Sequence, residues 1–181
     1  LARFNATAGV TYYIRAETFG SGGKFTLSLV DAAWQYATDD PIDTSPAIGP
    51  DGTIYLLDEF GLLHAVRTDG TRKWRTGAIT GYAYGGSLAV GPDGTLYAGG
   101  DFGYVYAINP DTGARKWRFE TGDFIWAAPA VAADGTIYAK SDDGVLYALN
   151  PDGTKKWQFS IPGDTYASPT VGADGTIYIG S

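Results

Sequence analysis

Residue types that usually carry chemistry are absent or scarce in this chain of 181 residues. Cysteine and methionine do not occur, and histidine occurs once, at His64. Without cysteine the chain can form neither a disulfide nor a zinc site of the usual cysteine-containing kind. No apolar run approaches the roughly 18 residues that a membrane-spanning helix requires. The sequence therefore predicts neither a disulfide scaffold nor a spanning helix within these residues.

Clusters of positive charge are also lacking. The chain carries 20 acidic and 13 basic side chains, which gives a formal net charge of −7. This balance argues against a nucleic-acid backbone or an anionic membrane surface as the partner. The hydrophobic fraction of 44 % is too high for a disordered chain.

An internal repeat organises most of the sequence. The pentad Asp-Gly-Thr-(Ile/Leu)-Tyr begins four times, at Asp51, Asp93, Asp134 and Asp174. A Lys-Trp pair keeps nearly the same spacing, with tryptophans at Trp74, Trp117 and Trp157, and Trp34 lies in the same phase. Two independent markers with a period of about 41 residues are typical of a repeat architecture.

Each repeat contains four short segments of strand character separated by turns rich in Asp and Gly. In the first full unit the expected strands are 45–49, 53–57, 62–67 and 72–76. No stretch has the 3.6-residue apolar period of a helix, so the fold class is all-β. Segments such as 53–57 and 145–149 are apolar on both faces, which favours the four-stranded blade of a β-propeller. A linear solenoid is the alternative.

The number of repeats predicts an incomplete ring. From Trp34 onward the chain supplies about three and a half blades, whereas a seven- or eight-bladed ring needs about twice as many. We expect an open arc with the inner strands 45–49, 87–91, 128–132 and 168–172 around one partial axis. The strand 176–180 should remain at an unpaired edge, and the Trp34 strand should lie at the opposite edge or on an N-terminal β-hairpin. On this count the chain is expected to be a piece of a longer protein.

Two segments carry a family resemblance. Residues 107–117 read AINPDTGARKW and residues 148–157 read ALNPDGTKKW. Both are similar to the repeat of quinoprotein-like propellers, the PQQ repeat, and the resemblance covers about residues 31–181. It implies that one tryptophan per blade docks on the next blade, here Trp34, Trp74, Trp117 and Trp157. We expect the indoles of Trp74, Trp117 and Trp157 to be largely buried near the next inner strand.

The first thirty residues do not share the repeat. Segments 8–15 and 24–29 alternate as strands around a Gly-rich turn, which predicts a hairpin. This hairpin is similar to the end of the bacterial pre-peptidase C-terminal domain. The resemblance implies a domain boundary near residue 30 and a bacterial or archaeal protein exported to the periplasm or the cell exterior.

The search for chemistry yields no catalytic, cofactor-binding or metal-binding residue. His64 occupies the slot that Tyr106 and Tyr147 fill in other units, so it is expected to be a packed strand residue. Asp58-Glu59 and Asp142-Asp143 are expected to cap turns. Asp39, Asp40 and Asp43 could hold Ca²⁺, although their spacing does not match an EF-hand. The cysteine pair, Trp floor and Ca²⁺ ligands of quinoprotein dehydrogenases cannot be assigned, so pyrroloquinoline quinone with Ca²⁺ is expected only if another part of the protein supplies the ligands.

The candidate binding surface consists of aromatic side chains in the loops that join one blade to the next: Tyr82, Tyr84, Phe124, Trp126 and Tyr166. Together they could anchor a protein, peptide or glycan ligand. The alternative is that they pack against the neighbouring blade.

Two functions remain open at this point. The first is a non-catalytic binding or assembly scaffold of an exported protein, which needs the rest of the same polypeptide to close its ring. The second is the N-terminal half of an exported enzyme, either a quinone-dependent dehydrogenase or a propeller-bearing hydrolase, with its active site elsewhere. Fold resemblance alone does not separate them.

Overall fold

The computed structural model describes residues 2–6, 10–14, 34, 36–81, 86–161 and 167–180, and within them every regular element is a strand. No helix in this part of the chain has the length and apolar character needed to cross a membrane. The prediction of an all-β fold is confirmed.

Three four-stranded antiparallel sheets follow one another along the chain, each with its strands in sequence order. Blade 1 contains β3 (Ala47–Ile48), β4 (Ile54–Leu57), β5 (Leu62–Val66) and β6 (Arg72–Ala78). Blade 2 contains β7 (Ala89–Val90), β8 (Leu96–Gly99), β9 (Tyr104–Ile108) and β10 (Arg115–Glu120). Blade 3 contains β11 (Ala130–Val131), β12 (Ile137–Ser141), β13 (Val145–Leu149) and β14 (Lys155–Ser160). A half blade of β15 (Thr170–Val171) and β16 (Ile177–Tyr178) follows.

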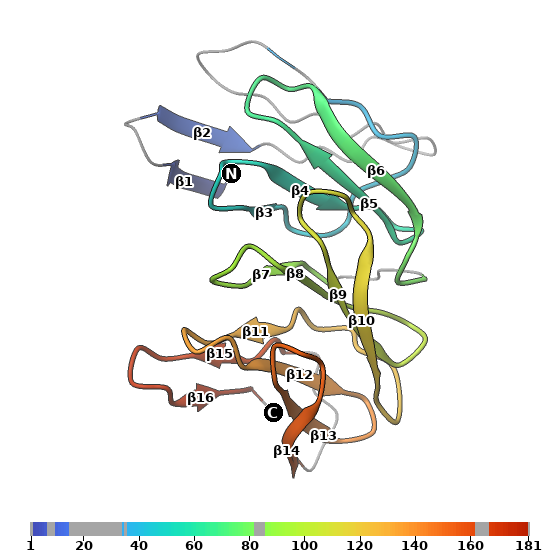
Figure 1. The fold of residues 1–181 in the computed structure, drawn as a ribbon, viewed down its shortest axis with the longest axis vertical. Helices are drawn as coiled ribbons and strands as arrows, with labels where there is room; N and C mark the ends of the chain where they lie inside the picture. Colours follow the sequence, from blue (N-terminus) through green and yellow to red (C-terminus); the bar gives the residue numbers. More distant parts are fainter. Residues whose placement is uncertain are drawn as a thin grey trace.

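The blades form an open arc, as the repeat count predicts. The inner strands β3, β7, β11 and β15 succeed one another along the molecule (Figure 1), and each contacts the next. Hydroxyls join the segments before them: Ser87 Oγ accepts the Ser45 N–H at 3.0 Å, and Ser168 Oγ accepts the Ala128 N–H at 3.1 Å. Among the described strands β16 pairs with β15 alone, so no pairing with the Trp34 segment closes a four-bladed ring.

Residues 34 and 36–42 cover the outer face of blade 1. Trp34, Tyr36 and Ile42 pack against Ile54 and Leu56 of β4, on the face that looks away from blade 2. Trp34 lies at the expected edge of the arc, but it is not part of a strand. The predicted strand at Trp34 is therefore wrong. Together with Tyr36 and Ile42, the indole covers the face of blade 1 that the outer strand of a preceding blade would cover.

The core lies between blades. Both faces of β4 are buried, and Tyr55 and Leu57 pack against Leu96, Ala98 and Tyr106 of blade 2. A second cluster of the same kind joins blade 2 to blade 3. Strands that are apolar on both faces are thus buried on both faces, which is the reason that the sequence favoured the blades of a propeller.

The turns between first and second strands share one hydrogen-bonding pattern. The Asp51 carboxylate accepts the Thr53 N–H at 3.0 Å and the Thr53 hydroxyl at 2.8 Å. Asp93 and Thr95 repeat this at 3.0 and 2.7 Å. Gly52 between Asp51 and Thr53 has φ of +80°, a backbone conformation that residues with a Cβ rarely adopt. The Asp-Gly-Thr repeat is therefore a turn signal with a physical cause.

These turns should make the chain sensitive to acid. Partial burial raises the pKa of Asp51 and Asp93, but the hydrogen bonds from Thr53 and Thr95 outweigh it, and both pKa values lie below their usual range. The pKa values of the exposed Asp134 and Asp174 are lowered by hydrogen bonds from Thr136 and Thr176 in the same way. A carboxyl group whose pKa is lower in the folded than in the unfolded state stabilises the folded state at pH values above the unfolded pKa. This stabilisation is lost as the pH falls through the pKa of the folded state.

We expect the melting temperature, followed by circular dichroism, to drop as the pH is lowered below about 4, where unfolded aspartates take up protons first. The Asp93→Asn variant should have a lower melting temperature at neutral pH, and its melting temperature should fall less on acidification. A melting temperature that stays constant through this range would contradict the assignment.

The N-terminal hairpin differs from the expected one. The predicted strand 8–15 is observed as β2 (Val10–Ile14), but it pairs with β1 (Ala2–Ala6), with Phe4 opposite Tyr12. Segment 24–29, the expected partner, lies outside the described residues. Alternating Ala2, Phe4 and Ala6 was the signal for β1 in the sequence. The assignment of residues 1–30 to a pre-peptidase-like domain stays a prediction.

Candidate functional site

Two kinds of loop meet at one end of each blade. They are the turn between the second and third strands and the loop that leads from one blade to the next. The Ile125 N–H donates to the Gly100 carbonyl at 3.2 Å, and the Asp142 N–H donates to the Phe124 carbonyl at 2.9 Å. Loop 121–127 is thus held by the turns of both blades that it joins. We call residues 58–61, 79–81, 100–103, 121–127 and 141–144 the loop end.

Three phenylalanines stand out from the loop end. Phe60, Phe102 and Phe124 have exposed fractions of 40, 65 and 42 %. Burying one such side chain is worth about 1.5–3 kcal/mol, so exposed phenyl rings on one end of a protein are a marker of a contact surface. The loop end therefore carries three exposed aromatic side chains.

Two of the five predicted surface residues are brought together here. The Phe124 and Trp126 rings meet edge to face with centroids 5.4 Å apart. Trp126 is half-buried, and its indole N–H donates to Asp142 Oδ2 at 2.5 Å. The alternative, packing on the neighbouring blade, thus describes Trp126 better than Phe124. Tyr82, Tyr84 and Tyr166 lie outside the described residues.

Phe60 and Phe102 were missed by the sequence analysis. Each directly precedes the glycine that completes the turn between second and third strands, Gly61 and Gly103. Their separation of 42 residues was the available signal, because it places two rings at the same end of successive blades. The prediction considered only the loops that join blades.

The charge of the loop end is entirely negative. Its segments contain the buried Asp58 and five further acidic residues, Glu59, Asp101, Asp123, Asp142 and Asp143, and no lysine or arginine. Asp143 Oδ2 accepts the Gly122 N–H at 2.9 Å and the Tyr147 hydroxyl at 2.6 Å. Burial, followed by the hydrogen bond to Asp143 and its charge, raises the pKa of Tyr147 to about 12. Tyr147 is therefore a neutral hydrogen-bond donor at neutral pH.

His64 belongs to a buried network rather than to an accessible site. Its Nε2 lies 3.1 Å from Asp58 Oδ2, and its Nδ1 lies 3.1 Å from the Tyr36 hydroxyl. Asp58 and His64 are 0 and 1 % exposed. An Asp–His pair can orient a catalytic base, but a substrate could not reach this one. The expected role of His64 as a packed strand residue is confirmed.

The predicted turn caps are present. Asp58 Oδ1 accepts the Phe60 and Leu62 N–H groups, and Asp143 Oδ1 accepts the Val145 N–H at 2.9 Å. Of the possible calcium ligands, Asp39 forms an ion pair with Arg75 at 2.9 Å. Within the described residues no three His, Cys, Asp or Glu side chains gather to hold a metal.

The tryptophans contact a different part of the next blade from the one expected. The indole N–H groups of Trp34, Trp74 and Trp117 donate to the carbonyls of Thr68, Pro110 and Pro151 at 3.0, 2.9 and 2.9 Å. Each acceptor lies in the turn between the third and fourth strands of the following blade, and the indoles are half-buried. The expected contact with the inner strand is wrong, because a side chain on an outer strand meets the outer half of its neighbour. Trp157 has no such turn in the described part of the fourth unit and is 36 % exposed.

Comparisons with known proteins agree with this architecture. The family model described as outer membrane protein assembly factor BamB matches residues 59–180, more than half of the chain. The crystal structure of BamB from Moraxella catarrhalis superimposes with a TM-score of 0.69 at 18 % identity, covering 91 % of this chain and 57 % of that chain. A protein of unknown function from Bacteroides caccae gives a TM-score of 0.60 at 16 % identity, covering 91 % and 63 %.

At these identities the two structures show the fold alone. The chain spans less than two-thirds of the length of either. None of the curated protein sequences matches it.

Proposed function

This chain belongs to the family of the outer membrane protein assembly factor BamB, and from that premise we propose that it is part of an exported, non-catalytic scaffold that binds another protein through its loop end. The relative's name describes an assembly factor at the outer membrane, which supports a periplasmic or extracellular place for this chain. The alternative of an exported enzyme with its active site elsewhere stays a prediction.

The observation that carries the proposal is the set of exposed phenylalanines at the loop end. Phe102 is 65 % exposed although it lies in a turn held by hydrogen bonds. A rigid turn presents its aromatic ring at a small entropic cost, which is what a binding hot spot requires.

The charge of the loop end narrows the class of partner. A surface with five carboxylates and no basic residue repels a phosphate backbone. It suits an apolar protein segment flanked by lysine or arginine, because electrostatic complementarity favours the correct encounter. We therefore propose a protein partner with an apolar, basic-flanked binding segment.

A peptide library displayed on phage tests the proposal with the purified chain as bait. We expect selected peptides to combine aromatic or aliphatic residues with lysine or arginine. Phe102→Ser and Phe124→Ser should each weaken binding of such a peptide by at least about tenfold, as for hot-spot residues. Tyr178→Ser removes an aromatic side chain of similar exposure, 59 %, from β16 and should leave the affinity unchanged.

Peptides that bind the Phe102→Ser and Phe124→Ser variants as tightly as the unaltered chain would contradict the proposal. Acidic peptides as the main class selected would contradict the charge argument.

A further inference from the structure

Basic side chains that are scattered in the sequence gather on the outer strands of the blades. Ten lysines and arginines occur between residues 31 and 181, and eight of them lie in β6, β10 and β14. The same three strands contain one acidic residue, Glu120. The outer strands are therefore positively charged in a chain whose formal net charge is −7.

Two exposed arginines of blade 2, Arg115 and Arg118, lie three residues apart on β10. Neither forms an ion pair with a residue that the structure describes. The lysines that precede the repeat tryptophans differ from them, because each pairs with an aspartate of a turn. We call Arg115 and Arg118 the arginine pair.

Two tyrosines of β9 hold the arginine pair in place. The Arg118 guanidinium lies 4.5 Å from the centroid of the Tyr104 ring, which is 5.9 Å from the ring of Tyr106. Burial raises the pKa of Tyr106, and the charges of Arg118 and Arg115 oppose this rise, so both guanidinium groups are near its hydroxyl. A cation that rests on an aromatic ring loses less freedom when it binds an anion.

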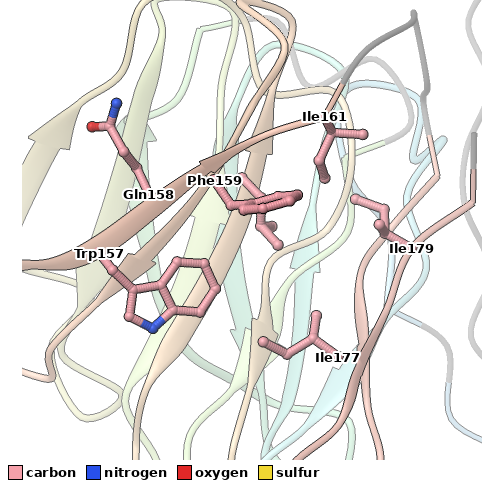
Figure 2. A pocket seen from close by; sticks show the side chains of 7 residues that line it. Trp157, Gln158, Phe159, Ile161, Ile177 and Ile179 are labelled. Atoms are coloured by element: carbon pink, nitrogen blue, oxygen red, sulfur yellow. The ribbon is translucent and has the colours of Figure 1, made fainter.

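The Arg118 position faces the preceding blade. In blade 3 the same repeat position is occupied by Gln158, and Figure 2 shows this side chain directed away from the rings of Trp157 and Phe159. The tryptophan position faces the following blade, because the indoles of β6 and β10 donate to turns there. Tyr106 agrees with this direction, since it packs in the cluster between blade 1 and blade 2.

Blade 1 shows what an arginine at this position binds. Arg72 and Arg75 of β6 occupy the repeat positions of the arginine pair, and residues 36–42 cover the face that they share. Arg75 Nη1 donates to Asp39 Oδ2 at 2.9 Å. Burial raises the pKa of Tyr36, and the charges of Arg72 and Arg75 oppose the rise. A tyrosine and an aspartate three residues apart therefore meet the two arginines of blade 1.

Blade 2 has no such carboxylate within the described chain. Asp39 follows Trp34 by five residues, and the residue that follows Trp74 by five is the apolar Ile79. The surface beside β6 is also open, because a Cβ added at Gly77 would meet no atom within 4 Å. The arginine pair thus has the surroundings of its counterpart in blade 1 without the acidic side chain.

We propose that the arginine pair binds an acidic segment of another protein, in which an aspartate or glutamate lies about three residues from an aromatic residue. The carboxylate accepts hydrogen bonds from the guanidinium groups, as Asp39 does from Arg75. A long polyanion is disfavoured because it would also meet the acidic loop end, and a second copy of the chain is disfavoured because both copies are negative. The arginine pair shares no residue with the loop end, so either proposal can fail without the other.

A fluorescent peptide with the sequence of residues 36–43, YATDDPID, tests the proposal against the whole 181-residue chain. We expect a dissociation constant below about 1 mM in about 50 mM NaCl, and weaker binding in about 500 mM NaCl because salt screens exposed charges. The same peptide with every aspartate replaced by asparagine should bind at least about tenfold more weakly. The Nε–H signals of Arg115 and Arg118 in nuclear magnetic resonance spectra should shift when the acidic peptide is added.

Matched variants separate the arginine pair from general charge attraction. Replacing both residues, Arg115→Gln with Arg118→Gln, should weaken binding of the acidic peptide by at least about tenfold. Lys155→Gln with Lys156→Gln removes two positive charges from β14 instead and should leave the affinity unchanged. Melting temperatures of both double variants show that they fold.

Four results would overturn the proposal. They are no binding at peptide concentrations of about 5 mM, equal affinity for the asparagine peptide, equal affinity of the double arginine variant, and displacement of the peptide by inorganic phosphate at about 1 mM. The last result would assign the arginine pair to a phosphate group rather than to the carboxylate of a protein segment.

Discussion

Replacing Gly153 with alanine should destabilise the chain by about 3 kcal/mol, several times the cost of the same change at Gly175. Both glycines have positive φ, +88° and +83°, so alanine is strained at either position by about 1 kcal/mol. They differ in what a Cβ would meet. At Gly153 it would lie 2.7 Å from Cδ2 of the Trp117 indole, whereas at Gly175 nothing lies within 4 Å.

The difference between the two variants isolates the tryptophan contact between blades. A methyl group forced against a packed ring costs about 1–3 kcal/mol beyond the backbone strain. Urea unfolding followed by far-ultraviolet circular dichroism gives both free energies, provided that the slopes agree. Equal losses at Gly153 and Gly175 would show that the indole does not rest on the turn.

A double-mutant cycle supplies the control. In a Trp117→Ala background the ring is gone, so Gly153→Ala should cost no more than Gly175→Ala. The same geometry recurs at Gly113, where a Cβ would lie 2.8 Å from Trp74. The tryptophan contact is therefore a property of the repeat and not of one blade.

The strands could be predicted from the sequence because their signals are local. Asp-Gly-Thr specifies a turn by its own hydrogen bonds, and Lys-Trp marks the outer strand. The predicted segments 53–57 and 62–67 contain β4 and β5. The open arc followed from the number of repeats, because every closed ring needs a partner for each edge.

Contacts between blades were less predictable because they depend on how two repeats are placed. The position of Trp117 on an outer strand could be read from the sequence, but its acceptor at Pro151 could not. Phe102 was missed for a related reason. A ring before a turn glycine can fold over the blade or project from it, and the residue type does not decide between these.

His64 illustrates the same limit within one blade. Its repeat slot predicted burial, since Tyr106 and Tyr147 fill that slot elsewhere. The partner differs between blades: His64 contacts Asp58, six residues before it, and Tyr147 contacts Asp143, four residues before it. The partner depends on which turn position carries the carboxylate and on its side-chain rotamer.

The buried Asp58 carboxylate leads to the second large effect, since Asp58→Ala should cost about 3–5 kcal/mol of unfolding free energy. Oδ1 accepts the Phe60 and Leu62 N–H groups at 3.1 and 2.9 Å, and Oδ2 lies 3.1 Å from His64 Nε2. Alanine leaves three polar groups without this partner in a region that excludes water. Loss of one member of a buried polar pair has a cost of this size.

Asp51→Ala is the matched control, because Asp51 also caps a turn in blade 1. Its side chain is 55 % exposed and accepts hydrogen bonds from Thr53, which water can replace. Its removal should cost about 1 kcal/mol, the net value of an accessible cap. Asp58→Asn keeps an acceptor for the two turn N–H groups and should fall between the two alanine variants. If Asp58→Ala and Asp51→Ala lose equal free energy in urea unfolding, the network of Asp58, His64 and Tyr36 does not stabilise blade 1.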